Sequence, residues 1–252
     1  LNDWARGEGA PGLGYIVQES GAGKGPIAKF VPEGAMADLR TLTGLSDGDA
    51  VFFVCDKVDA AAKLAGKART KIAQELDIIQ KGVFKLCWIV DFPMYKQDEE
   101  TGGKIDFTHN PFSMPDGGLE ALNTKNPLDI VANQYDCVCN GFELCSGSIR
   151  NHRPDIMERA FEIAGYSRED LHKKFGGMLS AFKFGAPPHG GAGFGVDRMI
   201  MLIADEPNLR EVYPFVMNGA GEDPMMGAPT EMTPQQLRDL HIKADLPKPK
   251  VV

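Results

Sequence analysis

The stretch that decides the fold is residues 188–203, which read PHGGAGFGVDRMIMLI. Its glycine-rich first half is too flexible for a helix and lets other groups approach the backbone closely. Its second half places apolar residues at helical spacing, at Val196, Met199, Ile200 and Ile203. The pattern predicts a strand or turn that runs into an amphipathic helix, with Arg198 in the first turn. Unpaired N–H groups there favour an anion and an arginine would reinforce a phosphate or purine site, whereas a plain surface arginine explains the residue equally well.

The glycines of this stretch do not follow the dinucleotide-binding pattern. Gly191, Gly193 and Gly195 give G-x-G-x-G instead of G-x-G-x-x-G, and two prolines precede them where a strand would be required. The phrase GFGVDR followed by an apolar helix instead resembles the third signature motif of class II aminoacyl-tRNA synthetases. In that family the arginine contacts ATP. The resemblance therefore implies an ATP site at Gly195, Val196, Asp197 and Arg198.

The composition predicts a soluble, cytoplasmic globular protein. The 252 residues are 43% hydrophobic, and no apolar run approaches the roughly 18 residues of a membrane span, so no membrane partner is expected. A net charge of −8 argues against indiscriminate nucleic-acid binding. A local basic surface and a solvated helix face both explain one run of cations: Lys57, Lys63, Lys67, Arg69, Lys71, Lys81 and Lys85. The five cysteines form no C-x-x-C pair and lie in apolar runs, which predicts reduced core thiols.

The first 82 residues predict a small α+β module. The expected elements are strands at 13–17, 27–30 and 50–55 and a helix at 33–42 that ends at Gly44. A second helix, which Asp56 or Asp59 could cap, is expected to run to about Leu76. Their order and wording resemble the later part of the insertion domain of bacterial aspartyl-tRNA synthetases. That module also occurs in a subunit that makes amidated aminoacyl-tRNA. We therefore expect a partial insertion-type domain at residues 1–82 and a second domain at residues 83–252.

A long irregular segment follows a predicted buried strand at 84–93 and an exposed turn at 97–104. Residues 107–118 are too rich in Pro, Gly and Asn for regular structure and are long enough to form a lid. His109 could donate to a carboxylate ligand or simply satisfy a loop carbonyl. The segment resembles the loop of aspartyl-tRNA synthetases that closes over the amino acid, which implies that His109 contacts the substrate. Asn110 stands where many relatives have a second histidine.

Two predicted strands, 134–139 and 142–149, flank an Asn140-Gly141 pair, which is a strong hairpin signal. Asp136 and Glu143 then lie on adjacent antiparallel strands and can face each other on one side of the sheet. Two carboxylates that close repel each other unless a cation lies between them, and Mg²⁺ suits oxygen ligands. The alternative is that one carboxylate points to water and the other pairs with a lysine.

Arg150 follows Glu143 by an odd number of residues, so a regular strand would place the two side chains on opposite faces. A shared site needs a β-bulge, which residues 146–148 could supply. The phrase GFELCSGSIR resembles the active-site strand of aspartyl-type synthetases. The resemblance implies that Asp136 and Glu143 coordinate Mg²⁺ with ATP, and that Arg150 holds the side-chain carboxylate of aspartate in bidentate geometry.

The remaining pattern completes an α+β fold. We expect helices at 155–164 and 167–175, the second capped by Ser167 with Asp170, and a loop-rich tail at 208–229. By resemblance, the fold is a mixed, mainly antiparallel class II synthetase catalytic sheet flanked by helices, present in part, with the insertion-type module before it. The first two class II motifs and an anticodon-binding barrel are missing from the sequence. We therefore expect the C-terminal part of a longer protein, inactive on its own.

The resemblance implies an aspartate–tRNA ligase. Its substrates would be ATP, with Mg²⁺, and L-aspartate, and its partners would be tRNA(Asp) and a second copy in a homodimer; charging of tRNA(Asn) stays open. An ammonia-dependent asparagine synthetase with the same site is one alternative. A non-catalytic tRNA-amidation partner is another, suggested by the first 80 residues alone. Lysyl or asparaginyl specificity within the class is a third.

Overall fold

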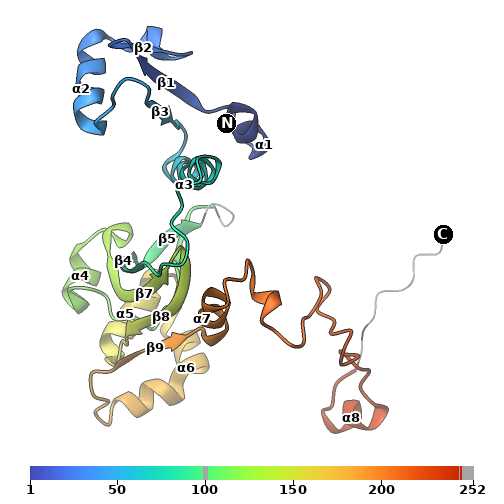
Figure 1. Ribbon diagram of the computed structural model, residues 1–252. Helices are drawn as coiled ribbons and strands as arrows, with labels where there is room; N and C mark the ends of the chain where they lie inside the picture. The colour runs from blue at the N-terminus through green and yellow to red at the C-terminus, as the bar shows by residue number, and fades with distance from the viewer. Residues whose placement is uncertain (99–101, 244, 246–252) are drawn as a thin grey trace, which may run out of the picture. The chain divides into compact units, whose positions relative to one another are not determined.

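The computed structural model describes residues 1–98, 102–243 and 245, and it divides into two compact units, Leu1–Val83 and Phe84–Val252 (Figure 1). Every strand pairing in the described residues is antiparallel, and helices accompany the sheets in both units. This confirms the predicted α+β class. The division lies one residue from the boundary expected from sequence, while the assignment of the first unit to an insertion-type module stays a prediction.

The first unit contains a three-stranded sheet of order β2-β1-β3. Its elements are α1 (Asn2–Gly7), β1 (Gly14–Glu19), β2 (Ala22–Lys24), η1 (Ala28–Phe30), α2 (Glu33–Thr43), β3 (Ala50–Phe53) and α3 (Val58–Glu75). A small core forms where Ala5, Leu13 and Ala68 meet. Helix α2 ends as predicted, because Gly44 takes the left-handed conformation at φ 67°.

Two sequence predictions for this unit were wrong. Residues 27–30 form no strand but end in the 3-10 turn η1, because Gly25 turns the chain at φ 132° and Pro26 offers no N–H to a ladder. Neither Asp56 nor Asp59 caps α3, whose first flanking residue is Lys57. The Asp56 carboxylate instead accepts from the Lys57 N–H at 2.7 Å.

The second unit is built on a four-stranded sheet of order β4-β7-β8-β9 (Figure 1). Its strands are β4 (Leu86–Pro93), β7 (Val131–Cys139), β8 (Phe142–Ile149) and β9 (Gly190–Phe194), with a separate ribbon of β5 (Tyr95–Asp98) and β6 (Lys104–Phe107). Its helices are α4 (Gly118–Thr124), η2 (Pro127–Asp129), α5 (Pro154–Ile163), α6 (Arg168–Phe182), α7 (Val196–Ile203), η3 (Leu209–Glu211) and α8 (Pro234–Asp239). Part of the turn expected at 97–104 lies outside the described residues.

Most of the predicted elements of this unit are confirmed. The β7–β8 hairpin turns at Asn140 and Gly141, with φ 50° and 88°. The Ser167 hydroxyl accepts from the Asp170 N–H at 3.1 Å and so caps α6 as expected. That helix, however, does not end at Phe175. It continues through two successive glycines to Phe182. Residues 208–229 are loop-rich as predicted, with the 3-10 turn η3 as their one helical segment.

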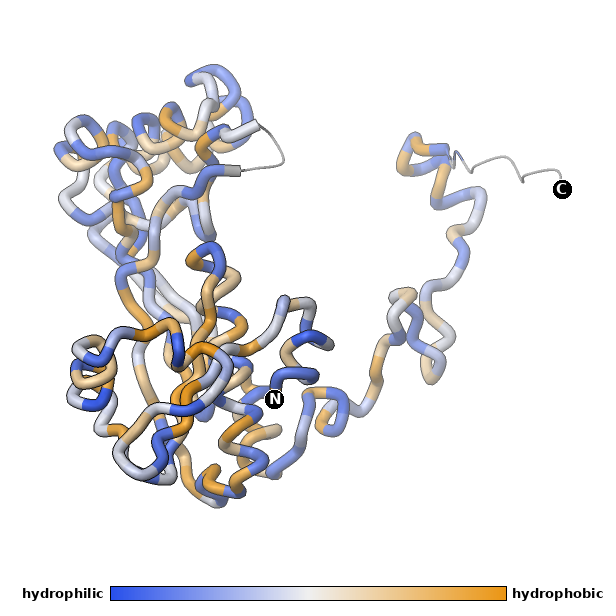
Figure 2. Tube along the Cα trace, turned by 90° about the horizontal axis from the view of Figure 1, so that it is seen from above, coloured by the Kyte–Doolittle hydropathy of each residue, from blue (hydrophilic) through white to orange (hydrophobic). Residues whose placement is uncertain are grey.

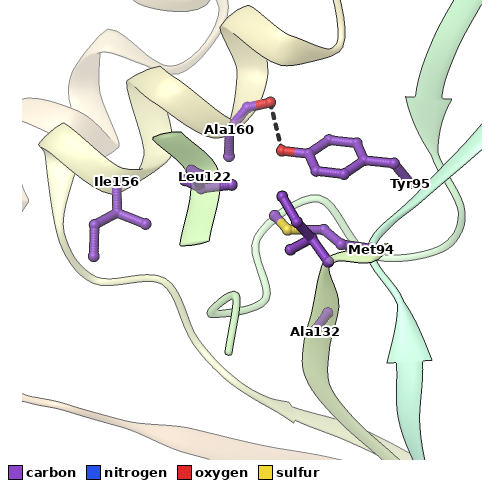
Figure 3. Close-up of a cluster of buried hydrophobic side chains, with 7 residues drawn as sticks. Met94, Tyr95, Leu122, Ala132, Ile156 and Ala160 are labelled. Carbon is purple, nitrogen blue, oxygen red and sulfur yellow. Dashed lines mark hydrogen bonds between the residues drawn. The ribbon is translucent and has the colours of Figure 1, made fainter. Parts of the chain in front are cut away.

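The main core of this unit lies between the helices and the start of β7. Figure 3 shows it, and its buried members are Met94, Tyr95, Leu122, Ile130, Ala132, Ile156 and Ala160. The Tyr95 hydroxyl donates to the Ala160 carbonyl at 2.9 Å, and burial raises the pKa of that phenol far above its usual range. A second cluster holds α5 to α6 and contains Met157, Phe161, Leu171 and Leu179. These two clusters fix the helices against one end of the four-stranded sheet.

The other end of the sheet is apolar but exposed, which corrects two predictions. Strand β4 was expected to be buried, yet Trp88 is 61% exposed, because β4 is an edge strand that pairs only with β7 in the described residues. In α7 the predicted core face is also open, with Val196 60% and Ile203 75% exposed, and Met201 is the buried residue. The cysteine prediction holds in part: Cys139 and Cys145 are buried and free, whereas Cys55 and Cys87 are exposed and free.

Hydrophobic stretches along the chain are short and alternate with hydrophilic ones (Figure 2). Within the described residues, we find no helix with the length and apolar character needed to span a bilayer. The predicted run of cations behaves as a solvated helix face where it lies on α3, since Lys67 pairs with Glu8 and Lys71 pairs with Glu75.

Candidate active site

A pocket of about 510 Å³ opens on one face of the four-stranded sheet. Four residues singled out from the sequence line it together, namely His109, Asp136, Glu143 and Arg150. The rest of the wall is formed by Phe92, Asn110, Gln134, Ser146, Gly147, Ser148, His189, Gly190, Gly191, Ala192 and Gly193. Glycines of β9 therefore form one side, where small residues leave the backbone open to a ligand.

A β-bulge in β8 brings the charged side chains to the same face. Cys137 pairs with Cys145 and Val138 pairs with Glu143, so Leu144 is the additional residue. Without this extra residue Arg150 and Glu143 would lie on opposite faces. The predicted bulge is thus present, but at Leu144 and not at residues 146–148.

Close packing explains why the bulge avoids residues 146–148. Gly147 pairs regularly with Tyr135 on one side and with Ala192 on the other. A Cβ atom on Gly147 would lie 2.4 Å from the Gly191 carbonyl oxygen and 2.5 Å from the Tyr135 ring. The glycine is required for close approach of the neighbouring strands, and the ladder stays regular there.

Arg198 contacts the wall of the pocket through Glu143. Its Nη1 donates to the Glu143 carbonyl at 2.8 Å and to the Glu143 Oε1 at 3.0 Å. The Gly195 N–H donates to the Leu144 carbonyl at 2.8 Å, so the bulge also anchors the start of α7. Arg198 is not among the residues that line the pocket, but its guanidinium is bonded to one that does.

The remaining residues of the predicted ATP site lie outside the pocket wall. Gly195 precedes α7, and the Val196 side chain is exposed. The Asp197 carboxylate accepts from the Tyr213 hydroxyl at 3.0 Å, and this hydrogen bond raises the pKa of Tyr213 above its usual value. These three residues thus lie next to Arg198 in the chain, and Arg198 joins them to the pocket through Glu143.

Residues 108–116, here named the strap, cross the opposite end of the pocket. The Asn151 N–H donates to the Phe112 carbonyl at 2.7 Å, and the Met114 N–H donates to the Ile149 carbonyl at 2.8 Å. Ser113 forms a β-bridge with Arg150 and is fully buried. The segment expected to act as a lid is therefore a strap hydrogen-bonded to the end of β8.

The strap and the sheet also place the two predicted amino-acid contacts. The His109 ring packs edge to face on Phe92, with centroids 5.4 Å apart. The Arg150 guanidinium carbon lies 5.6 Å from the centroid of the Phe112 ring. Both side chains line the pocket, so a small anionic ligand could contact an arginine and a histidine at once.

The carboxylates of the pocket suit a hydrated magnesium ion that also binds phosphate. Asp136 and Glu143 both line the wall, beside the Ser146 hydroxyl. Across the described residues there is no cluster of three or more His, Cys, Asp or Glu side chains fit to hold a metal. Mg²⁺ commonly uses one or two carboxylates with water and phosphate oxygens, so the donor set fits it. Glu143 forms its ion pair with Arg198. The alternative interpretation of the two carboxylates expected a lysine as the partner.

Sequence reasoning missed two polar residues of the floor. Gln134 and Ser148 pair across β7 and β8, line the pocket, and are 9% and 4% exposed. The signal was available, because Gln134 precedes Asp136 by two residues and Ser148 precedes Arg150 by two, and a strand has a period of two.

Comparison with known proteins fits this geometry. The family model described as tRNA synthetases class II (D, K and N) matches residues 29–219. The chain belongs to this family. An aspartate–tRNA(Asp/Asn) ligase of Gluconobacter oxydans is 60% identical over 99% of this chain and 42% of its own length. One from Paramagnetospirillum magneticum is also 60% identical, over 99% of this chain and 28% of its own length.

This class II synthetase chain therefore spans less than half the length of these relatives. Among solved structures, an aspartyl tRNA synthetase from Entamoeba histolytica overlaps with a TM-score of 0.41 at 21% identity, over 75% of this chain and 31% of that chain. That partial overlap carries no part of the assignment, which rests on the family model and the sequence relatives.

Proposed function

We propose that the protein containing this chain is an aspartate–tRNA ligase, which activates L-aspartate with ATP and transfers the aspartyl group to tRNA(Asp). The observation that carries the proposal is the bulge at Leu144. It brings Asp136, Glu143 and Arg150 to one wall, with Glu143 hydrogen-bonded to Arg198. Opposite charges at the two ends of one pocket suit a substrate pair of amino acid and nucleotide.

The amino-acid end recognises aspartate by its side-chain carboxylate. Arg150 offers a planar guanidinium that forms two parallel hydrogen bonds to a carboxylate, and the His109 ring donates a further one. An asparagine amide would leave the guanidinium without a counter-charge, which is why aspartate is preferred. The backbone bridge between Ser113 and Arg150 supports the position of this arginine.

The nucleotide end holds ATP. Asp136 and Glu143 would bind Mg²⁺, which neutralises phosphate charge when bound, while Arg198 with Gly195, Val196 and Asp197 holds the nucleotide. In the first step an oxygen of the aspartate α-carboxylate attacks the α-phosphorus and pyrophosphate leaves. In the second a ribose hydroxyl of tRNA attacks the activated carbonyl and AMP leaves. The pocket aligns the reactants, and neither step requires a protein base.

Three further parts of the proposal concern the whole protein. The relatives carry the name aspartate–tRNA(Asp/Asn) ligase, so we include tRNA(Asn) as a second acceptor beside tRNA(Asp). We also propose a homodimer and a cytoplasmic location, as the resemblance to aspartyl-tRNA synthetases implies.

The test is aspartate-dependent exchange of pyrophosphate into ATP by the full-length protein, followed by charging of the two tRNAs. Exchange with aspartate, and none with asparagine or lysine, is the expected result. Formation of asparagine from aspartate, ATP and ammonia would identify the synthetase paralogue instead. Absence of ATP binding would identify a tRNA-amidation partner. The 252-residue chain alone is expected to show no exchange.

A further inference from the structure

A buried amide separates the acidic side chains of the pocket from Arg150. Gln134 lies on β7, two residues before Asp136, and its register partner Ser148 lies two residues before Arg150. By strand periodicity all four side chains share one face, and all four line the pocket. Gln134 thus occupies the floor between the nucleotide end and the amino-acid end.

The amide of Gln134 reaches the strap. Its Nε2 donates to the Asn110 carbonyl at 3.3 Å, across 24 positions of sequence. The same carbonyl accepts from the Ser113 N–H at 3.3 Å, and the Asn110 side chain accepts from the Phe112 N–H at 2.9 Å. The strap makes a tight turn here, and Gln134 ties that turn to the sheet.

His109 lies between two fixed points as a result. On one side the Thr108 N–H donates to the Met94 carbonyl at 3.0 Å. On the other side Asn110 is held by Gln134. The first link is formed by backbone groups and withstands substitution. On the other side, backbone hydrogen bonds hold the strap from Phe112 onward. Gln134 adds a side-chain hydrogen bond to Asn110, the residue directly next to His109.

We propose that Gln134 is a positioning residue for the amino-acid substrate: it holds the strap turn so that His109 meets the substrate opposite Arg150. The inference rests on the proposed aspartate activation. An amide suits the task because it donates to the strap without adding charge. A carboxylate there would lack the donor and would repel both Asp136 and an anionic substrate.

The test uses the full-length enzyme and pyrophosphate exchange with varied aspartate and varied ATP. Gln134→Leu removes the donor at similar volume, and Gln134→Glu removes it and adds a charge. Asn133→Ala is the matched control, because Asn133 is the preceding amide and its side chain is exposed on the other face of β7. Thermal unfolding of each variant accompanies the kinetics.

Gln134→Leu is expected to raise the KM for aspartate about tenfold, as loss of a partly buried neutral hydrogen bond allows, with the KM for ATP changed by less than about twofold. Gln134→Glu is expected to raise it further, and Asn133→Ala to leave it unchanged. An unchanged aspartate KM in Gln134→Leu and Gln134→Glu overturns the inference. So does a parallel rise of both KM values with a lower melting temperature, which a purely structural role would give. If the wild-type enzyme shows no aspartate-dependent exchange, the proposed function itself fails.

Discussion

The two ends of the pocket are built differently. Toward the amino-acid end the floor residues Gln134 and Ser148 are buried, and the strap is hydrogen-bonded to β8 beside two hydrophobic clusters. At the nucleotide end α7 buries only Met201, and the Glu143 and Arg198 side chains are 45% and 40% exposed. Strand β9, which borders the whole pocket, is exposed at every residue. Packing therefore fixes the first end, and a few polar contacts on exposed elements hold the second. Substitutions at the packed end should therefore lower activity more than substitutions at the exposed end.

The largest effect is expected at the packed end. Arg150→Leu in the full-length enzyme should lower kcat/KM for aspartate by roughly 10³-fold or more, because a carboxylate loses its paired charge inside a fixed pocket. The measurement is pyrophosphate exchange at varied aspartate. Arg153→Leu is the control, since Arg153 pairs with Asp155 outside the pocket and should leave exchange near the wild-type rate. Equal losses in the two variants would show that Arg150 has no special part in binding.

A smaller effect is expected at the exposed end. Arg198→Ala should lower kcat/KM for ATP by about 10²-fold through loss of charge-assisted hydrogen bonds, while aspartate binding changes little. The exposed Arg210 lies beyond α7, and Arg210→Ala serves as the control. An unchanged ATP dependence in Arg198→Ala would remove the nucleotide from this end of the pocket.

The sequence predicted the hairpin and its charged residues because those signals are local. Asn140-Gly141 favours a tight turn, and the strand period sets the faces. The odd spacing from Glu143 to Arg150 even required a bulge. The position of the bulge could not be predicted from the sequence, because it depends on long-range contacts. The Leu144 carbonyl accepts a hydrogen bond from the Gly195 N–H, about fifty residues away along the chain, and tight packing keeps the ladder regular at Gly147.

Burial was the weaker prediction, for a related reason. Apolar periodicity shows which face of β4 or α7 avoids water, but not whether this chain provides the surface that covers it. Strand β4 is an edge strand, and the α7 stripe that includes Val196 and Ile203 is open. For β4 and α7 the local pattern therefore predicted the element correctly and its environment incorrectly.

A pair of tyrosine hydroxyls offers a stability test of the same comparison. Tyr95→Phe removes the buried bond to the Ala160 carbonyl and should destabilise the second unit by about 1–2 kcal/mol in urea unfolding. Tyr135→Phe removes a 3.2 Å bond to the Gly191 carbonyl on exposed β9 and should cost less than about 0.5 kcal/mol. Similar losses in both variants would contradict the claim that packed contacts stabilise this unit more than contacts on the exposed strand β9 do.

The smallest effect concerns the contact between Tyr213 and Asp197 at the exposed end. The Asp197 carboxylate raises the pKa of Tyr213 by accepting its hydroxyl proton in a hydrogen bond. A raised folded-state pKa means that the contact is fully present below the ordinary tyrosine value of about 10 and is lost as the pH rises through the higher folded value. Asp197→Asn should therefore shift the phenolate absorbance of Tyr213 to lower pH, with Tyr213→Phe identifying the signal. An identical titration in Asp197→Asn would mean that residues after α7 do not dock beside Arg198, which would leave the nucleotide end with the Glu143 contact as its main polar support.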